Sequence, residues 1–306
     1  MMTEEEEEEE DILTSDRILF YVQSLNNPKI RYIKTDFIKS RDKTRNPTII
    51  HMSPSWRPSD IIPTNQLTVD LKEVEVLITG HSDYEINEDE LDLLEELLPN
   101  LKIWICQNKN IRHTKLISIP IGITNATEPG SQIHQILGNT LHITQILKTP
   151  KQIKNLAYLN ISSNTYPKER TQVINLYKDK PWVTYAPPIM SHEGHYEFLE
   201  NIYRHKFVFA PRGNGIDTHR MWEALYLRTI PIVRYCVGME DFKDLPILFV
   251  KEWDDEWLNN EDYLQSKYDE IMMKWIKEEE NTQSKTSSSK FITLSRWKEF
   301  ISAFVE

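Results

Sequence analysis

Glycines and ionisable side chains are concentrated between Phe207 and Val233, in the segment FVFAPRGNGIDTHRMWEALYLRTIPIV. Apolar runs at the two ends of the segment predict strands at 207–210 and 230–233, and a helix from about Thr218 to Leu227 lies between them. The loop Pro211–Gly215 contains two glycines, which permit a close approach of the backbone to a ligand. Because the first N–H groups of a helix favour an anion, this pattern predicts a site for a diphosphate.

The charged residues of the same segment suit a nucleotide. Arg212 and Arg220 offer bidentate contacts to phosphate oxygens. Glu223 lies among apolar helix residues, where it is either a hydrogen-bond acceptor for ribose hydroxyls or simply exposed on one helical face. Asp217 is either part of the ligand site or the N-cap of the helix, accepting from its first N–H groups.

The order of these residues resembles the C-terminal domain of exostosin-like glycosyltransferases and related xylosyltransferase-type proteins. Their pattern is Lys-Phe, an apolar strand, Pro-x-Gly, a polar turn, Arg, Glu-Ala-Leu and an Ile-Pro-Ile/Val strand. It is matched by Lys206-Phe207, Pro211-Arg212-Gly213, Asp217 to Arg220, Glu223-Ala224-Leu225 and Ile230-Pro231-Ile232-Val233. The glycine that usually precedes the last strand is replaced by Arg228 or Thr229, and the match does not extend beyond this segment.

The resemblance implies an α/β fold of the GT-B type, in which two Rossmann-like domains face each other across a cleft and a C-terminal helix returns to the N-domain. It also implies a UDP-sugar donor, an inverting and metal-independent transfer, and a glutamate that faces the nucleotide ribose. The donor-binding residues carried over from it are Arg212, Gly213, Asn214, Gly215, Asp217, Thr218, Arg220 and Glu223.

A second polar loop, NISSNTYPKER, follows the predicted strand 155–160. In two-Rossmann transferases the first such loop of the C-domain contacts donor phosphates, which would make Arg170 the cation. The other donor contacts predicted here are Asn160, Ser162 and Ser163. A loop rich in Ser and Asn is also the composition of an ordinary surface loop.

The catalytic base is expected from the N-domain, where ITGHSDYEI follows the strand 75–79. Transfer to a hydroxyl needs a group that takes its proton, and a carboxylate or imidazole near the cleft can do so. Asp83 is the first candidate and His81 the second. Alternatively, Asp83 is a turn residue that caps the helix 88–98 and His81 is hydrogen-bonded in place. The residues predicted to bind the acceptor are Ser82, Tyr84, Gly122 and, by stacking on a sugar, Trp56.

No metal or other cofactor is expected, since the nucleotide sugar is a substrate. His192, Glu193 and His195 look like metal ligands, but a third-ligand pattern is missing, and we expect a polar loop before a helix at 196–203. The acids 241, 244, 254 and 255 do not form the Asp-x-Asp motif of metal-dependent transferases. Arginines and helix N-termini can replace a divalent ion at a diphosphate.

Alternating strands and helices predict the domains. The N-domain (15–150) has strands at 17–23, 48–51, 75–79, 102–106 and 116–119 and helices at 88–98 and 131–147. The C-domain (151–285) has strands at 155–160, 182–185, 207–210, 230–233 and 247–250 and a helix at 261–277. Residues 1–14 form a disordered acidic tail, and 286–306 contain the helix 291–305 that packs back on the N-domain.

Composition excludes some partners. Of 47 acids, eight are consecutive at Glu4–Asp11, which leaves 39 acids against 36 Lys and Arg and so no basic field for nucleic acid. Cys106 and Cys236 are expected as buried free thiols. Neither a signal peptide nor a membrane-spanning run is visible, so the cytoplasm is expected, or the Golgi if an anchor precedes this sequence.

The sequence therefore predicts a glycosyltransferase that moves a sugar from a nucleotide-sugar donor to a glycan or other hydroxyl acceptor. The alternative is a catalytically inert protein of the same fold that binds a nucleotide sugar or a glycan. The sugar, the linkage and the oligomeric state stay open.

Overall fold

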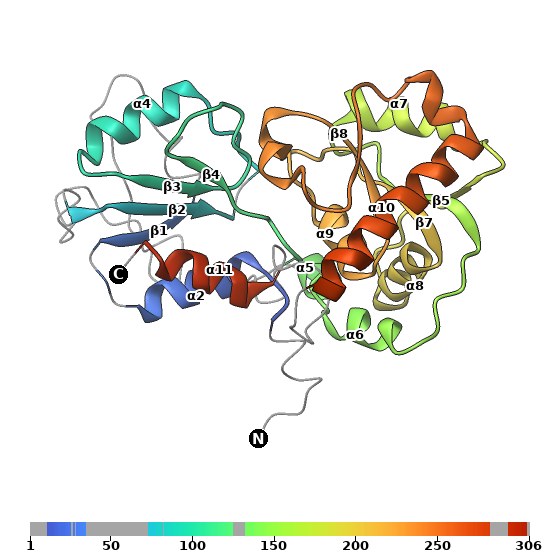
Figure 1. Ribbon diagram of the computed structural model, residues 1–306, viewed down its shortest axis with the longest axis horizontal. Coiled ribbons are helices and arrows are strands. Elements are labelled where there is room, and N and C mark those ends of the chain that lie inside the picture. Colours follow the sequence, from blue (N-terminus) through green and yellow to red (C-terminus); the bar gives the residue numbers. More distant parts are fainter. Residues whose placement is uncertain are drawn as a thin grey trace.

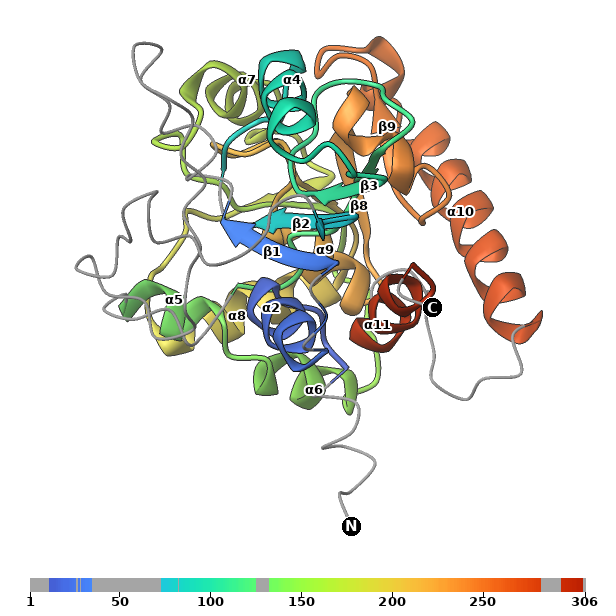
Figure 2. The same cartoon turned by 90° about the vertical axis from the view of Figure 1, so that its left-hand side faces the viewer.

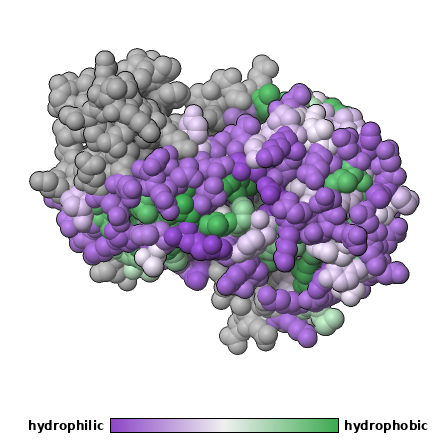
Figure 3. Space-filling view, turned by 90° about the horizontal axis from the view of Figure 1, so that it is seen from above, coloured by the Kyte–Doolittle hydropathy of each residue, from purple (hydrophilic) through white to green (hydrophobic). Residues whose placement is uncertain are grey.

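The computed structural model describes residues 11–25, 27, 29–34, 73–81, 83–124, 132–281 and 293–304 of the chain. Two α/β halves lie side by side (Figure 1), one with a four-stranded and one with a five-stranded sheet. All pairings between these described strands are parallel. The predicted fold class, α/β with two parallel sheets, is confirmed. Seen from above, the surface is mostly hydrophilic, with small hydrophobic areas between the halves (Figure 3).

The first sheet has the order β1-β2-β3-β4, with β1 at Ile30–Lys34, β2 at Val76–Gly80, β3 at Ile103–Cys106 and β4 at Leu116–Ser118. Side chains alternate between its two faces. Leu77 and Trp104 pack toward helix α4 (Glu88–Leu97). Ile78 and Ile105 pack toward helices α2 (Ser15–Ser24) and α11 (Leu294–Ser302) on the opposite face (Figure 2). Strand β1 was not predicted, and the predicted strand 48–51 lies outside the described residues.

The prediction of a strand at Arg17–Gln23 is wrong, because these residues belong to helix α2. Ile18 and Val22, one helical turn apart, are both buried, while Phe20 between them is half exposed. That spacing fits a helix rather than a strand. Helix α11 packs against α2, and its Leu294 lies in the same core cluster as Ile18 and Val22 of α2. The C-terminal helix therefore does return to the first half.

The second sheet has the order β6-β5-β7-β8-β9, and helices cover both of its faces. Its strands are β5 Asn155–Leu159, β6 Val183–Tyr185, β7 His205–Phe209, β8 Ile230–Arg234 and β9 Leu248–Val250. Its helices are α7 Pro167–Tyr177, α8 His192–Tyr203, α9 His219–Tyr226 and α10 Glu261–Asn281, with short 3-10 helices at Val237–Phe242 and Glu256–Asn259.

The connection between the halves differs from its prediction. A single helix was expected over 131–147, but the chain forms α5 (Gln132–Leu137) and α6 (Leu141–Leu147), separated at Gly138. Glycine weakens a helix interior, which accounts for the break. Residues 12–14, expected in the disordered tail, are packed instead: Ile12 and Leu13 are buried, and the N–H of Leu13 donates to the Tyr226 hydroxyl at 2.8 Å.

Other predictions concern single residues. Cys106 is buried in β3, where burial raises the pKa of its thiol, and Cys236 lies half-buried in the loop after β8; both are free. Trp253, Trp275 and Trp297 are buried, and Trp257 packs partly buried against the core of the second half. Within the described ranges, no helix combines the length and the apolar character needed to cross a membrane.

Candidate functional site

The loops after β5 and β7 meet where the winding of the second sheet reverses. Strand β5 lies between β6 and β7. The chain leaves β5 through α7, which packs on one face, and leaves β7 through α9, which packs on the other. In open α/β sheets a crevice forms outside the carboxyl ends of the strands at such a reversal, and ligands bind there. Both loops that the sequence singled out in this half follow these two strands.

A pocket of about 400 Å³ opens at this place, and both halves of the molecule line it. Ten of the twelve predicted donor-binding residues are among its lining: Asn160, Ser162, Arg170, Gly213, Asn214, Gly215, Asp217, Thr218, Arg220 and Glu223. Asp83, Ile121 and Thr124 come from the first half. The structure therefore brings the first candidate base to the predicted donor residues.

Two glycines let the loop after β7 lie close to its neighbours. A Cβ atom on Gly213 would lie 3.2 Å from a guanidinium nitrogen of Arg170. On Gly215 it would lie 3.0 Å from the amide oxygen of Asn108 and 3.2 Å from a carboxylate oxygen of Asp83. Both approaches are tighter than most Cβ contacts, so any larger residue at these positions would require the ends of Arg170, Asn108 or Asp83 to shift by a few tenths of an ångström. They also show that the Asp83 carboxylate reaches across to the loop of the other half.

Two arginines supply positive charge to the pocket. Arg170 is 8 % exposed, and its Nε donates to the carbonyl of Arg212 at 2.9 Å. Burial, and then the nearby charge of Arg220, lower the pKa of Arg170 to about 10. The guanidinium of Arg220 lies 5.2 Å from the centre of the Phe198 ring, and its buried Nε has no partner among the described residues. Because the two guanidinium groups repel each other, an anion bound between them would stabilise both charged forms.

Two buried carboxylates differ in their surroundings. Burial raises the pKa of both Asp217 and Glu223 to about 7. Asp217 accepts hydrogen bonds from the backbone N–H of Ile121 at 2.7 Å and from the Trp222 indole at 2.8 Å, so it joins the two halves of the molecule. The positive charge of Arg220 opposes this effect of burial at Glu223, because it lowers the pKa of the carboxylate. Glu223 is thus the carboxylate better placed to accept from a ligand.

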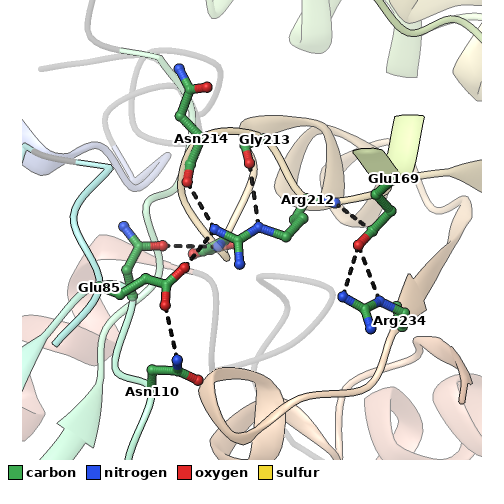
Figure 4. A network of polar contacts seen from close by, with 9 residues as sticks. Glu85, Asn110, Glu169, Arg212, Gly213, Asn214 and Arg234 are labelled. Atoms are coloured by element: carbon green, nitrogen blue, oxygen red, sulfur yellow. Dashed lines mark hydrogen bonds and ion pairs between the residues drawn. The ribbon is translucent and has the colours of Figure 1, made fainter. Parts of the chain in front are cut away.

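Arg212 does not line the pocket, although it was expected to bind the donor. Its guanidinium donates to a carboxylate oxygen of Glu85 at 2.7 Å and to the carbonyl of Asn214 at 2.9 Å (Figure 4). The guanidinium also stacks over the Tyr166 ring, 4.3 Å from its centre. The backbone N–H of Arg212 donates to Glu169, which also pairs with Arg234 at 2.9 Å. Arg212 therefore links the loop to the first half.

Three of the remaining predicted N-domain residues, His81, Tyr84 and Gly122, do not line the pocket. His81 has a left-handed backbone (φ 56°), and its N–H donates to the Gln107 side chain at 3.1 Å. Tyr84 is half exposed. Gly122, also left-handed, accepts from His219 at 2.7 Å through its carbonyl. Ser82 and Trp56 lie outside the described residues. Ser163, the last predicted donor residue, is exposed on the loop after β5 and lies outside the lining.

The structure adds pocket residues that sequence reasoning missed. The helix expected at 196–203 begins at His192, because Ser191 caps it by accepting from the N–H of Gly194 at 3.0 Å. His195 and Phe198 therefore share a helix and both line the pocket. Phe198 lies in the predicted helix, whereas His195 lies where a polar loop was predicted. The sequence signal for this earlier helix start was Ser191, a residue type that favours the N-cap position. Across the described residues, no group of three His, Cys, Asp or Glu is arranged to hold a metal ion.

Comparison with known proteins gives structural likenesses only. No family model and no curated protein match the sequence, so the exostosin-like resemblance stays a prediction. An α1,3-fucosyltransferase with GDP-fucose matches at 11% identity and TM-score 0.38, covering 76% of this chain and 78% of that one. A second α1,3-fucosyltransferase structure matches at 12% and 0.43, covering 94% and 83%. An α,α-trehalose-phosphate synthase (UDP-forming) from Burkholderia vietnamiensis matches at 11% and 0.38, covering 75% and 65%. With TM-scores below 0.5, none of these likenesses carries weight for function, which rests on the site.

Proposed function

We propose that this chain is a glycosyltransferase that transfers a sugar from a nucleotide-sugar donor, a UDP-sugar by resemblance, to a hydroxyl acceptor. One observation carries the proposal. A single pocket brings the exposed carboxylate of Asp83, from the first half, to Arg170, Arg220 and Glu223 of the second half.

The second half would bind the donor. Its diphosphate would lie against the glycine loop, between Arg170 and Arg220, where charge-assisted hydrogen bonds are strong. The N-terminus of α9 adds its own N–H groups. Glu223 would accept hydrogen bonds from the ribose hydroxyls.

The reaction needs one proton acceptor and a stabilised leaving group. Asp83 would take the proton of the acceptor hydroxyl while its oxygen forms the bond to the anomeric carbon. The bond between that carbon and the diphosphate oxygen breaks, and the nucleoside diphosphate leaves with the electron pair. Arg170 and Arg220 would stabilise the negative charge that develops on it. Attack from the side opposite the leaving group inverts the anomeric centre.

A thermal-shift screen over UDP-, GDP- and CMP-sugars tests the proposal, because a ligand that binds the folded state raises the melting temperature. We expect a shift with UDP-sugars. No shift with any donor would contradict the proposal. A shift without hydrolysis or transfer of any donor, unchanged in Asp83→Asn, would instead favour the inert nucleotide-sugar-binding protein.

A further inference from the structure

Two histidines form a hydrogen-bonded pair beside the pocket. His195 on α8 is 2 % exposed and lines the pocket, and its Nδ1 lies 3.2 Å from Nδ1 of His142 on α6. The Nε2 of His142 lies 3.0 Å from the side-chain nitrogen of Asn139. The contacts therefore run in one line from Asn139 through His142 to His195.

With the side-chain nitrogen of Asn139, and not its oxygen, facing His142, this line of contacts assigns the protons. An amide nitrogen only donates, so Nε2 of His142 accepts and its proton is on Nδ1. That Nδ1 donates to His195, whose own proton must then be on Nε2. Both rings are neutral near pH 7, since burial lowers the pKa of His142 and lowers that of His195 to about 4.

The resulting donor has no acceptor in the protein. Nε2 of His195 is buried and has no hydrogen-bond partner within the described part of the chain. A buried donor without a partner is costly, by about 1–3 kcal/mol. Such a group persists where a bound molecule supplies the missing acceptor.

We propose that the Nε2–H of His195 donates to an acceptor oxygen on the nucleoside part of the bound nucleotide, and so helps to select the donor. This rests on the proposed function. His195 lies one helical turn before Phe198, over which Arg220 stacks, and Arg220 in turn is the charge that acts on Glu223. His195 therefore lies on the side of the pocket that holds Arg220 and Glu223, and Glu223 is the residue assigned to the ribose.

Calorimetric titration of the whole chain with UDP and with inorganic pyrophosphate tests this. His195→Asn places its amide near the position of Nδ1 and leaves nothing at Nε2, so UDP should bind about tenfold more weakly, as for one lost hydrogen bond to a partner left buried. Pyrophosphate, which has no nucleoside, should bind equally to both. His195→Gln carries a donor near the position of Nε2 and should keep most of the affinity for UDP. The control is His192→Asn, an exposed histidine on the same helix outside the pocket lining.

The outcomes separate the two proposals. Unchanged UDP binding in His195→Asn, or equal weakening of pyrophosphate binding, overturns the assignment of His195 while the donor site stands. If the unaltered protein binds neither UDP nor UDP-sugars, the proposed function itself fails. Nitrogen-15 NMR of the unaltered protein gives a readout independent of any variant's folding: His195 should be protonated at Nε2, and protonation at Nδ1 would overturn the inference.

Discussion

The loops after β2 and after β7 occupy matching places at the carboxyl ends of buried strands, but they are built differently. The loop after β7 has glycines in close contact, and the helix that follows it carries Arg220 and the buried Glu223. The loop after β2 leaves Asp83 exposed and Tyr84 half exposed. Under the proposed function, the groups assigned to the donor are therefore preformed in one half, whereas the other half presents to them the one carboxylate assigned as the base.

The loop after β3 holds these two halves in register. Asn108 has a left-handed backbone, and its side chain accepts from the N–H of Asp217 at 2.9 Å. Lys109 is 5 % exposed and pairs with Asp241 at 2.6 Å, and the same carboxylate accepts from the N–H of Ser118 at 2.7 Å. Lys109 is buried whereas the Asp241 side chain is 34 % exposed, so removing the carboxylate would leave a buried positive charge without its partner, which is costly. The pocket therefore depends on contacts that neither half makes alone.

The largest effect is expected where the reactive half is changed. Asp83→Asn should lower the rate of sugar transfer by about 100- to 10,000-fold, because the proton acceptor is lost, and should leave the affinity for UDP unchanged. Transfer kinetics and UDP titration measure the two quantities. His81→Asn should have little effect, since His81 does not line the pocket. A larger loss in His81→Asn than in Asp83→Asn would make His81 the base.

The next effect concerns the binding half. Arg220→Met should weaken UDP binding by about 10- to 100-fold, through the loss of charge-assisted hydrogen bonds to the diphosphate. Arg212→Met, which removes the ion pair with Glu85 outside the pocket, should change UDP affinity much less. Calorimetry on both variants decides. Equal losses would mean that Arg212 shares the phosphate site after all.

The buried carboxylate should make the binding half sensitive to pH. The pKa of Glu223 is raised to about 7 in the folded protein, so the stability linked to its proton is present below about pH 4.5 and is lost as the pH rises through 7. Glu223→Gln cannot ionise, so the variant should not show the fall in stability that accompanies ionisation of Glu223. Relative to the variant, the unaltered protein should lose about 1–3 kcal/mol of unfolding free energy between pH 4.5 and 8. Urea unfolding across this range measures it, with the exposed Glu197→Gln as control. Parallel curves for Glu223→Gln and the unaltered protein would contradict the burial argument.

The smallest effect separates backbone strain at the pocket from strain elsewhere. His81, Asn108 and Tyr166 are left-handed at the ends of strands or loops near the pocket, whereas Arg228, with φ 54°, ends α9 outside the lining. Arg228→Gly should stabilise the protein by about 0.5–1 kcal/mol without changing UDP affinity.

Arg204→Gly is the matched control for this variant. Arg204 ends α8 at a φ of −88°, where glycine relieves nothing and should destabilise the protein. Urea unfolding compares the two variants. A loss of stability in Arg228→Gly would show that the arginine side chain contributes more than its backbone costs.

Local pattern was enough to predict the second sheet and half of the residues that line the pocket. Strands such as 207–210 and 230–233 are short apolar runs, and the residues that follow each of them lie at the edge of the sheet by topology alone. The glycine expected before the last strand of the exostosin-like pattern falls at Arg228, which adopts the conformation that glycine favours.

Other features depend on contacts that sequence does not encode locally. The strand predicted at 17–23 failed because its apolar residues also fit a helical face, and the partner that selects the helix, α11, is far away in sequence. Arg212 looked like a phosphate ligand because its partner, Glu85, comes from the other half. The role of His195 depends on His142, on a helix of the connecting region.

The placement of α11 has a consequence for how the chain is made. A ribosome releases residues 15–124 long before 294–302, yet the second face of the first sheet, which α2 covers in part, is not fully covered until Leu294, Trp297 and Ile301 are available. The core clusters of the second sheet draw on 155–281 and on earlier residues such as Ile12 and Ile143, and they include no described residue after 281. Folding during synthesis should therefore finish in reverse order, with the half made second completing first and the half made first waiting for the last helix.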